Sequence, residues 1–295
     1  MTAFDEARAR TLLAGACRTA GLPAPDGARL LALGENAVFD LGSPALVAKV
    51  GRNPALLPRA ARELAVAAWL DAAGIPVVRP RHPEPVTACG HPVTFWHRLP
   101  APVRPARTAD LAPLLRALHA LPAPEGLPLG PRDLLAPVDG WLAAAAGHVD
   151  PADTAFLRAR KESFVTAAAA LTPHLTPGPV HGDALPRNVH VGPGGPVLLD
   201  LENAGHDLRE HDLVVLALSQ DRYGVPEEEY RAFTAAYGWD VRDWDGFAVL
   251  RGARETASAS WVAQHVPGNP AAAAEFRRRV DSLRNGSASV RWYPF

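Results

Sequence analysis

One short segment of the chain, residues 181–188, places an acid and an amide five residues apart. The segment reads HGDALPRN, and the two residues are Asp183 and Asn188. In a loop, these side chains can converge on one site, where the carboxylate accepts a proton from a hydroxyl and the amide oxygen binds a metal ion. Asp200 follows twelve residues after Asn188, at the end of the second strand of a predicted hairpin. Because a hairpin returns the chain to its start, we predict that all three share one cavity, and such oxygen ligands suit Mg²⁺.

The order of these residues resembles that of the aminoglycoside phosphotransferase and choline kinase family. Members carry a His-Gly-Asp…Asn loop followed by Ile-Asp-Trp-Glu, and the matching text here is VHGD…NV at 180–189 and LDLE at 199–202. The family pattern continues with a glycine and an Asp-Leu pair, matched by Gly205 and Asp212-Leu213. The resemblance covers roughly residues 25–265. It implies a bilobal protein-kinase-like fold and the ATP-dependent transfer of the γ-phosphate to a hydroxyl of a small molecule.

The resemblance also implies a role for each matching residue in the second half of the chain. Asp183 is the catalytic residue that orients or deprotonates the acceptor hydroxyl, and Asn188 and Asp200 hold Mg²⁺. Glu202 binds the metal through water or orients the loop. Arg187 departs from the family, which frequently has a small residue before the Asn. It either reaches the transferring phosphate as a further catalytic residue or forms a salt bridge, and both interpretations stay open.

Lys49 is one of only two lysines in the sequence, and it lies in the apolar, strand-like run ALVAKV. A charge in such a run usually has a partner. In kinase-like folds, a strand lysine binds the α- and β-phosphates and pairs with a glutamate on the following helix. Glu63 has the matching position here. Because Arg59 and Arg62 lie beside it, Glu63 could instead be a solvated helix charge, but we predict the ion pair with Lys49.

Two further segments complete the predicted ATP site. The resemblance implies that residues 34–40, GENAVFD, form the loop over ATP, with Gly34 and Asn36 as binding residues. A single glycine makes this segment equally compatible with an ordinary hairpin turn. The resemblance also implies that Thr94 to Leu99 is the hinge whose backbone binds adenine. We assign Phe95 and Arg98 of this hinge to the cofactor site.

Several polar residues near the catalytic segment have structural interpretations. We predict that His181 holds the loop backbone, that Asp212 braces the loop without touching substrate, and that His119 packs inside a helix. Four histidines crowd this region, which raises the alternative of a metallohydrolase with a transition-metal site. They are His181, His190, His206 and His211. No pair of them has the i, i+4 spacing with a nearby Glu that zinc proteases show.

The predicted acceptor side of the protein lies in the C-terminal third of the sequence. Residues 221–255 contain eight acidic residues and five arginines. An acidic pocket favours a cationic acceptor, such as an aminoglycoside, a basic peptide antibiotic or an amino alcohol. Charged runs on helices are also common as solvated faces. A sugar or homoserine-type metabolic kinase and a non-catalytic kinase-like binding protein are the alternatives, so both antibiotic resistance and metabolism stay open as roles.

The elements that must position these residues form a two-part α+β pattern. The first part combines a helix at 4–20, two short strands within 29–50 around Gly42-Ser43-Pro44, a helix at 59–73, and extended segments at 77–80 and 92–96. A Pro-rich linker spans 100–105. The second part is mostly helical, with helices predicted at 111–121, 151–171, 210–219, 226–237, 243–265 and 270–284, around one hairpin of 189–191 and 197–201. We place the boundary at residue 99, giving a nucleotide-binding N-lobe (1–99) and a catalytic, substrate-binding C-lobe (100–295).

Composition limits the remaining possibilities. The 295 residues carry a formal net charge of −1, which gives no global field to attract nucleic acid or an anionic membrane. Neither of the two cysteines belongs to a CxxC pair, and no apolar run approaches the length of a membrane span. We therefore expect a cytoplasmic enzyme whose partners are ATP, Mg²⁺ and a small-molecule hydroxyl substrate. The sequence predicts no particular oligomeric state.

Overall fold

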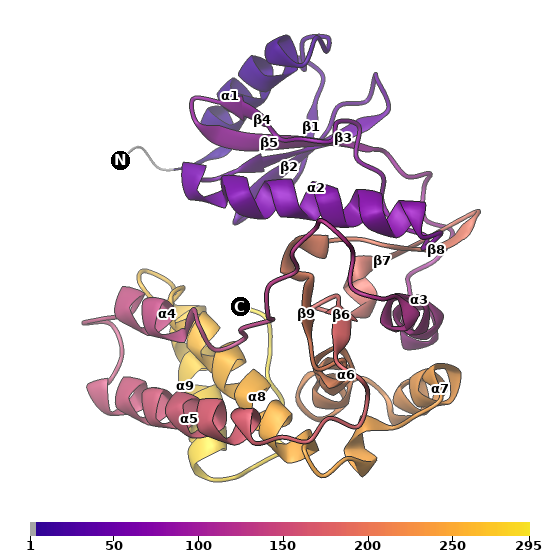
Figure 1. The fold of residues 1–295 in the computed structure, drawn as a ribbon. Helices are drawn as coiled ribbons and strands as arrows, with labels where there is room; N and C mark the ends of the chain where they lie inside the picture. Colours follow the sequence, from indigo (N-terminus) through magenta and orange to yellow (C-terminus); the bar gives the residue numbers. More distant parts are fainter. Residues whose placement is uncertain (1–3) are drawn as a thin grey trace. The chain divides into compact units, whose positions relative to one another are not determined.

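The computed structural model describes residues 4–295, which divide into two compact units. Of the described residues, unit 1 contains 4–106, 124–128 and 187–204, and unit 2 contains 107–123, 129–186 and 205–295. Figure 1 shows the strand-rich part of the chain in indigo and the mainly helical part in magenta to yellow. The predicted α+β class is therefore confirmed. Residues 187–204 belong to unit 1 although they follow the predicted boundary at residue 99, and the functional division at that residue stays a prediction.

Unit 1 is built on a five-stranded antiparallel sheet with the strand order β1-β2-β3-β5-β4. The strands are β1 (Arg29–Leu33), β2 (Asn36–Asp40), β3 (Leu46–Gly51), β4 (Val86–Ala88) and β5 (His91–His97). The sequence predicted two strands within residues 29–50, whereas the structure has three, β1, β2 and β3. The additional turn lies at Gly34 and Glu35, because the chain reverses there to pair β1 with β2.

Two helices of unit 1, α1 (Glu6–Thr19) and α2 (Leu57–Ala72), pack against this sheet, and Figure 1 shows the sheet between them. Helix α1 begins where the Asp5 carboxylate accepts the backbone N–H of Arg8 at 2.8 Å, a typical N-cap. Its buried face, which includes Leu12 and Leu13, shares one hydrophobic core with Phe39 and Phe95 of the sheet. The 3-10 turn η1 (Pro54–Leu56) precedes α2.

The predicted hairpin is present as β7 (Val189–Gly192) and β8 (Gly195–Leu198) and belongs to unit 1. Its tight turn uses Gly195 at φ 102°, a conformation that only glycine adopts without strain. The backbone N–H of Val78 donates to the carbonyl oxygen of Leu198 at 3.0 Å, and that of Val103 donates to Val191 at 2.9 Å. These bonds attach the hairpin to the segment between α2 and β4 and to the segment that follows β5.

Unit 2 is mainly helical. Its helices are α3 (Thr108–Ala120), α4 (Val138–Ala144), α5 (Pro151–Ala169), α6 (Glu210–Tyr223), α7 (Glu227–Tyr237), α8 (Phe247–Ala263) and α9 (Pro270–Arg284). Two short strands, β6 (Gly178–Val180) and β9 (Gly205–Asp207), pair antiparallel. Residues of α4, α5, α8 and α9 form one hydrophobic core, which includes Leu157 and Phe276, and Trp292 of the segment after α9 packs into it. Helices α6 and α7 end at Gly224 and Gly238, both left-handed, as is common at helix C-termini.

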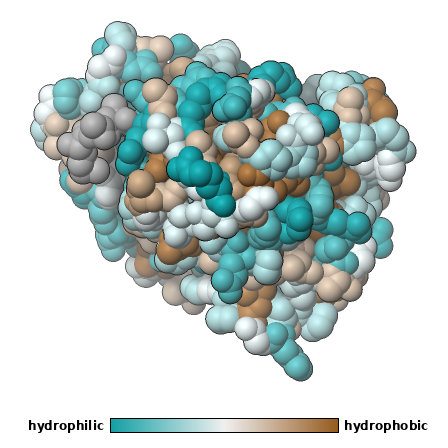
Figure 2. Space-filling model, turned by 90° about the horizontal axis from the view of Figure 1, so that it is seen from above, coloured by the Kyte–Doolittle hydropathy of each residue, from teal (hydrophilic) through white to brown (hydrophobic). Residues whose placement is uncertain are grey.

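Three short 3-10 turns complete the described elements: η2 (Pro186–Asn188), η3 (Leu201–Asn203) and η4 (Val241–Asp243). No helix within residues 4–295 is long and apolar enough to cross a membrane. Figure 2 shows hydrophilic and hydrophobic residues mixed over one face of the molecule.

Candidate active site

A cluster of charged side chains in unit 1 is centred on Lys49 of β3. Because side chains alternate along a strand, Ala48 and Val50 enter the core shared with α1 and Lys49 points to the opposite side of the sheet. There its ammonium group lies 3.1 Å from both carboxylate oxygens of Glu63 on α2. The two side chains are only 18% and 6% exposed. The predicted ion pair is therefore present.

The same ammonium group contacts two further carboxylates. Its Nζ lies 2.9 Å from Oε2 of Glu202 and 3.3 Å from Oδ1 of Asp200. Burial alone lowers the pKa of Lys49, but the three carboxylates, Glu63 foremost, raise it well above its ordinary value. Burial raises the pKa of Glu63 above its ordinary value; Lys49 opposes this shift, while Glu202 and Asp200 add to it. One buried cation thus holds three acids together.

A small cavity, partly open to solvent, lies beside this cluster within unit 1. It is lined by residues of β2, β3, η1, α2, β5 and η3, namely Asn36, Lys49, Gly51, Leu56, Arg59, Ala60, Glu63, Pro92, Thr94 and Glu202. The predicted ATP-site residues Asn36, Lys49 and Glu63 are therefore neighbours around one cavity. Arg59, which the sequence analysis treated only as a neighbour of Glu63, is part of the same wall.

The hairpin places Asn188 and Asp200 at its open end, as predicted. Val189 pairs with Leu198, and the backbone N–H of Leu199 donates to the carbonyl oxygen of Asn188 at 2.9 Å. Asp200 has the left-handed φ of 57°, which costs a residue other than glycine about 1–2 kcal/mol. Such strain is concentrated at functional sites in proteins. The left-handed turn ends the extended course of β8 and begins η3, which carries Glu202.

The oxygen donors in this region match the chemistry of a magnesium ion. Asp200 and Glu202 supply carboxylates and Asn188 supplies an amide, and Mg²⁺ at nucleotide sites takes few protein ligands plus phosphates and water. Across residues 4–295, no group of three or more His, Cys, Asp or Glu side chains is arranged to hold a metal ion. The carboxylates are arranged around the ammonium group of Lys49 instead. The donor set therefore fits Mg²⁺ in its chemistry.

The catalytic segment before the hairpin belongs to unit 2, where Asp212 of α6 braces it. The buried carboxylate accepts the backbone N–H of His181 at 2.7 Å and that of Gly182 at 2.8 Å. The ring of His181 lies 3.3 Å from the backbone N–H of Asp183 and is fully buried. The predictions that Asp212 braces this loop and that His181 holds its backbone are both confirmed.

His119 of α3 extends this network. Its Nε2 lies 3.1 Å from Oδ2 of Asp212, and its Nδ1 lies 2.8 Å from the hydroxyl of Tyr237. Burial alone raises the pKa of Asp212, but the hydrogen bonds from His119 and from the loop hold it below the ordinary range. Burial, together with the charge of Asp212, raises the pKa of Tyr237 to about 12. His119 packs inside its helix as predicted, and it also fixes the acid that holds the loop.

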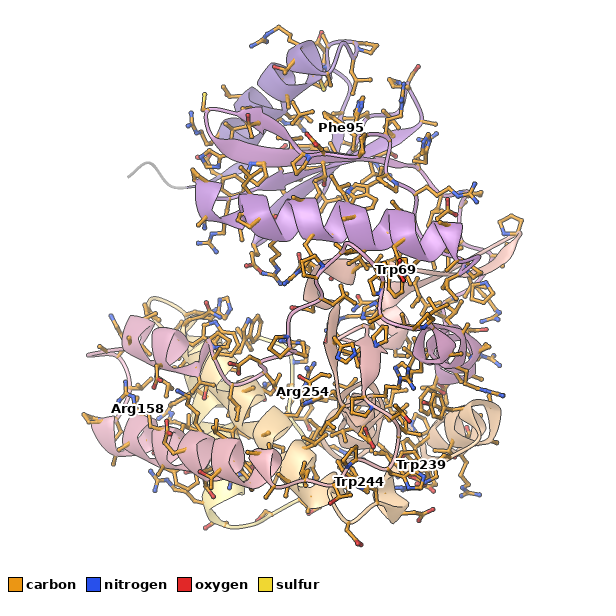
Figure 3. The ribbon with its side chains drawn as sticks, in the orientation of Figure 1. Trp69, Phe95, Arg158, Trp239, Trp244 and Arg254 are labelled. Atoms are coloured by element: carbon orange, nitrogen blue, oxygen red, sulfur yellow. The ribbon has the colours of Figure 1, made fainter. Side chains whose placement is uncertain are left out.

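Asp183 itself is paired with Arg254 of α8, which Figure 3 labels. The guanidinium NH2 lies 2.6 Å from Oδ1 of Asp183, and NH1 lies 3.5 Å from the carbonyl oxygen of Gly182. Arg132 donates to that carbonyl oxygen from Nε at 3.2 Å. Two guanidinium groups therefore converge on the Gly182–Asp183 peptide. The sequence analysis missed both, because Arg254 and Arg132 lie 71 and 50 residues from their partners.

The remaining predicted residues have diverse surroundings. Gly34 lies in the turn between β1 and β2, where an added Cβ would meet no atom within 4 Å. Phe95 is buried in the core of unit 1, and its carbonyl oxygen accepts the backbone N–H of Arg81. The Arg98 side chain pairs with Asp40 at 3.1 Å. Arg187 is exposed in η2. The roles of these residues at a cofactor or catalytic site stay predictions, as does the cavity shared by Asp183 with the acids of unit 1.

The acidic excess of residues 221–255 is largely neutralised within unit 2. Arginines pair with Asp221, Glu227, Asp240 and Glu255. For Asp240, burial raises the pKa but hydrogen bonds from Arg242 and Tyr230 hold it below the ordinary value. The pairs of Asp221 and Glu255 join α6 to α8, and the Tyr230 hydroxyl joins α7 to the cap of η4. Much of this charge is therefore structural.

The sequence matches one known protein family over most of its length. The model of the phosphotransferase enzyme family matches residues 28–250. No curated protein sequence matches the chain.

Among solved structures, an amicoumacin kinase in complex with AMP-PNP, Ca²⁺ and Ami is 14% identical, with a TM-score of 0.66 and 90% of each chain covered. A choline/ethanolamine kinase family protein from Mesorhizobium loti is 21% identical, with a TM-score of 0.64 and 96% of each chain covered. An aminoglycoside phosphotransferase from Streptomyces rimosus is 18% identical, with a TM-score of 0.60, 82% of this chain and 97% of that chain covered. These likenesses show that the fold is the protein-kinase-like fold of these enzymes.

Proposed function

Because the chain belongs to the phosphotransferase enzyme family, we propose that it transfers the γ-phosphate of ATP to a hydroxyl of a small molecule. The observation that carries the proposal is the cluster in which Lys49 contacts Glu63, Asp200 and Glu202 beside one cavity. A strand lysine paired with a helix glutamate and close to a metal-binding aspartate is the arrangement that protein kinases use for phosphoryl transfer.

In the proposed reaction, Asp183 orients the acceptor hydroxyl and takes its proton as the oxygen attacks the γ-phosphorus in line with the departing ADP oxygen. The hydroxyl oxygen forms the new P–O bond, and the bond from the γ-phosphorus to the bridging oxygen of ADP breaks. Arg254 holds Oδ1 of Asp183, and Asp212 holds the two backbone amides before it, so the carboxylate is fixed before substrate binds. Such preorganisation is a main source of catalysis for this reaction.

Lys49 would bind the α- and β-phosphates, and the three carboxylates around its ammonium group keep it charged at neutral pH. Asn188, Asp200 and Glu202 would hold Mg²⁺. When bound, the ion neutralises phosphate charge and orients the γ-phosphate.

The acceptor is proposed as a class of hydroxyl compounds. The excess of acidic residues in 221–255 favours a cationic acceptor, but ion pairs with arginine reduce its weight. The solved relatives include an amicoumacin kinase and an aminoglycoside phosphotransferase bound to kanamycin. Aminoglycosides, basic peptide antibiotics and amino alcohols therefore form the first set of acceptors to test. Sugars and homoserine-type compounds form the second.

The test is a screen of these two sets with ATP and Mg²⁺, in which mass spectrometry detects an acceptor that gains a phosphate. With an acceptor found, Asp183→Ala should lower the rate of transfer by about 10²–10⁴-fold, since it removes the general base, while nucleotide affinity measured by calorimetry stays near that of the unaltered protein. Full activity of Asp183→Ala would refute the assigned role. Nucleotide binding without any phosphorylated product would favour the alternative of a non-catalytic binding protein.

A further inference from the structure

Arg59, in the first turns of α2, connects two segments that are far apart in sequence. Its NH1 lies 2.9 Å from Oε1 of Glu35, in the turn between β1 and β2. Its NH2 lies 2.6 Å from Oε1 of Glu202 and 3.3 Å from Oδ1 of Asn203, both in η3. The two terminal nitrogen atoms of one planar guanidinium group thus contact the predicted nucleotide loop and the predicted metal-binding turn at the same time.

The contacts of Glu202 explain why a second cation is needed there. Its two carboxylate oxygens are divided between Lys49, at 2.9 Å from Oε2, and Arg59, at 2.6 Å from Oε1. If Lys49 turns to the phosphates of a nucleotide, Glu202 loses one of its two cations. Arg59 then remains to fix its orientation. The rigid fork of an arginine can serve two acids in this way, whereas the single ammonium group of a lysine cannot reproduce the geometry.

Arg59 also lines the cavity that contains Lys49, Asn36 and Glu202. Its side chain is 29% exposed, compared with 68% for Arg79, whose partner Asp71 lies at the surface. A partly buried guanidinium group between two carboxylates loses less to solvent screening than a surface pair. Glu202 is 13% exposed and Glu35 is 50% exposed, so the contact of Arg59 with Glu202 is the stronger one and the contact with Glu35 restrains the turn more weakly.

We propose that Arg59 is a positioning residue that couples the Glu35 turn to Glu202, so that the nucleotide loop and the metal-binding carboxylate are ordered together. This inference rests on the proposed function, because it takes Glu202 as a magnesium ligand. Arg59 does not touch the reacting atoms; it acts through the two acids. Because Arg59 contacts both acids, the loop that binds nucleotide and the carboxylate that binds metal are held in their binding positions together.

The experiment compares Arg59→Met, Arg59→Lys and Glu35→Gln with the surface control Arg79→Met. Calorimetry measures the binding of a non-hydrolysable ATP analogue across a range of Mg²⁺ concentrations, and hydrogen exchange of the nucleotide-free protein follows residues 34–36. Arg59→Met should raise the Mg²⁺ concentration for half-maximal binding by about 10–100-fold, the usual effect of losing a residue that orients a metal ligand. It should also speed exchange at residues 34–36.

The other variants separate the two arms of the guanidinium group. Glu35→Gln should speed exchange at residues 34–36 but change the Mg²⁺ requirement by less than about 3-fold, because Glu202 keeps its own contact with Arg59. Arg59→Lys should retain the Mg²⁺ requirement and still speed loop exchange. An Arg59→Met protein that matches Arg79→Met in both measurements would overturn the inference. If the unaltered protein binds no nucleotide, the proposed function fails by itself. Hydrogen exchange then still decides on the Arg59–Glu35 coupling, and unchanged exchange in Arg59→Met would refute it.

Discussion

Replacing Lys49 by methionine tests the central cluster directly, because it removes one cation from three carboxylates. Glu202 keeps Arg59 at 2.6 Å, and Asp200 is 41% exposed, so water can compensate its charge. Glu63 is 6% exposed and loses its partner. Removing one member of a buried pair costs about 3–5 kcal/mol. Since one carboxylate carries most of the penalty, we expect Lys49→Met to lower the free energy of unfolding by about 3 kcal/mol at pH 8.

The loss of unfolding free energy in Lys49→Met should depend on pH. The folded pKa of Glu63 is already raised, so the folded chain holds a proton on this carboxyl more tightly than the unfolded chain. Its contribution to stability is therefore most favourable at low pH and is lost as the pH rises through the folded value. In Lys49→Met, the pKa of Glu63 rises further, because the cation that favours its charged form is gone. For each pH unit below this pKa, protonation of Glu63 recovers about 1.4 kcal/mol of the lost free energy of unfolding. The penalty should fall below about 1.5 kcal/mol at pH 5.

The assay is urea unfolding at pH 5, 6.5 and 8, with Lys161→Met as the matched control. Lys161 is the other lysine of the chain and pairs at the surface with Asp139, so its replacement should change stability by less than about 0.5 kcal/mol. The double variant Lys49→Met with Glu63→Gln removes both charges and should regain about 2 kcal/mol at pH 8, since an uncharged pair leaves no unpaired charge. If the loss of unfolding free energy in Lys49→Met does not change with pH, or if the effects of the two substitutions simply add, then Glu63 is not the charge that Lys49 compensates.

Two further predictions concern unit 2. Asp212→Asn leaves one oxygen atom to accept two loop amides, so one buried N–H loses its partner. We expect it to lower the free energy of unfolding by about 2–4 kcal/mol. The control Asp281→Asn, at an exposed position, should change that free energy by less than about 0.5 kcal/mol. The lowered pKa of Asp212 contributes stability that is lost as the pH falls through the pKa of the folded state. The difference in unfolding free energy between Asp212→Asn and the unaltered protein should therefore shrink below about pH 4 in acid titrations. A difference that stays constant would contradict this prediction. Arg254→Met releases the carboxylate of Asp183 and should lower kcat by about 10²-fold with little change in the KM for ATP. Arg251→Met, one turn earlier on α8 and paired with Asp221, should leave kcat within about 3-fold in the same steady-state assay, and equal effects of the two would refute the role of Arg254.

The parts of the site that could be predicted from sequence are those fixed by short spacing. The hairpin followed from two apolar runs around a Gly-rich turn, and with it the return of Asp200 to the neighbourhood of Asn188. The ion pair of Lys49 with Glu63 followed from the family pattern and an unusual charge in a strand. In each case the residues lie close in sequence or on consecutive elements, so local geometry determines their contact.

The contacts that could not be predicted connect distant segments. Arg59 lies 143 residues from Glu202, and His119 lies 93 residues from Asp212. Helical spacing could show only that Arg59 and Glu63 share one side of α2. The short strands β6 and β9 and the seven-residue α4 also escaped prediction, because such brief elements give too little periodicity.

The distribution of unit 1 over three separate stretches of the chain has a consequence for how such a protein can change. Asp200 and Glu202 are encoded 151 and 153 codons after Lys49, yet they complete the cluster around it. A fragment ending at residue 106 would retain Lys49 and Glu63 but lack both of these acids. A single recombination between two related genes, at any point between codons 106 and 187, would likewise join a lysine from one parent to acids from the other. The cluster can therefore be inherited intact only when both ends of the coding sequence come from one parent or when the parents match at these positions.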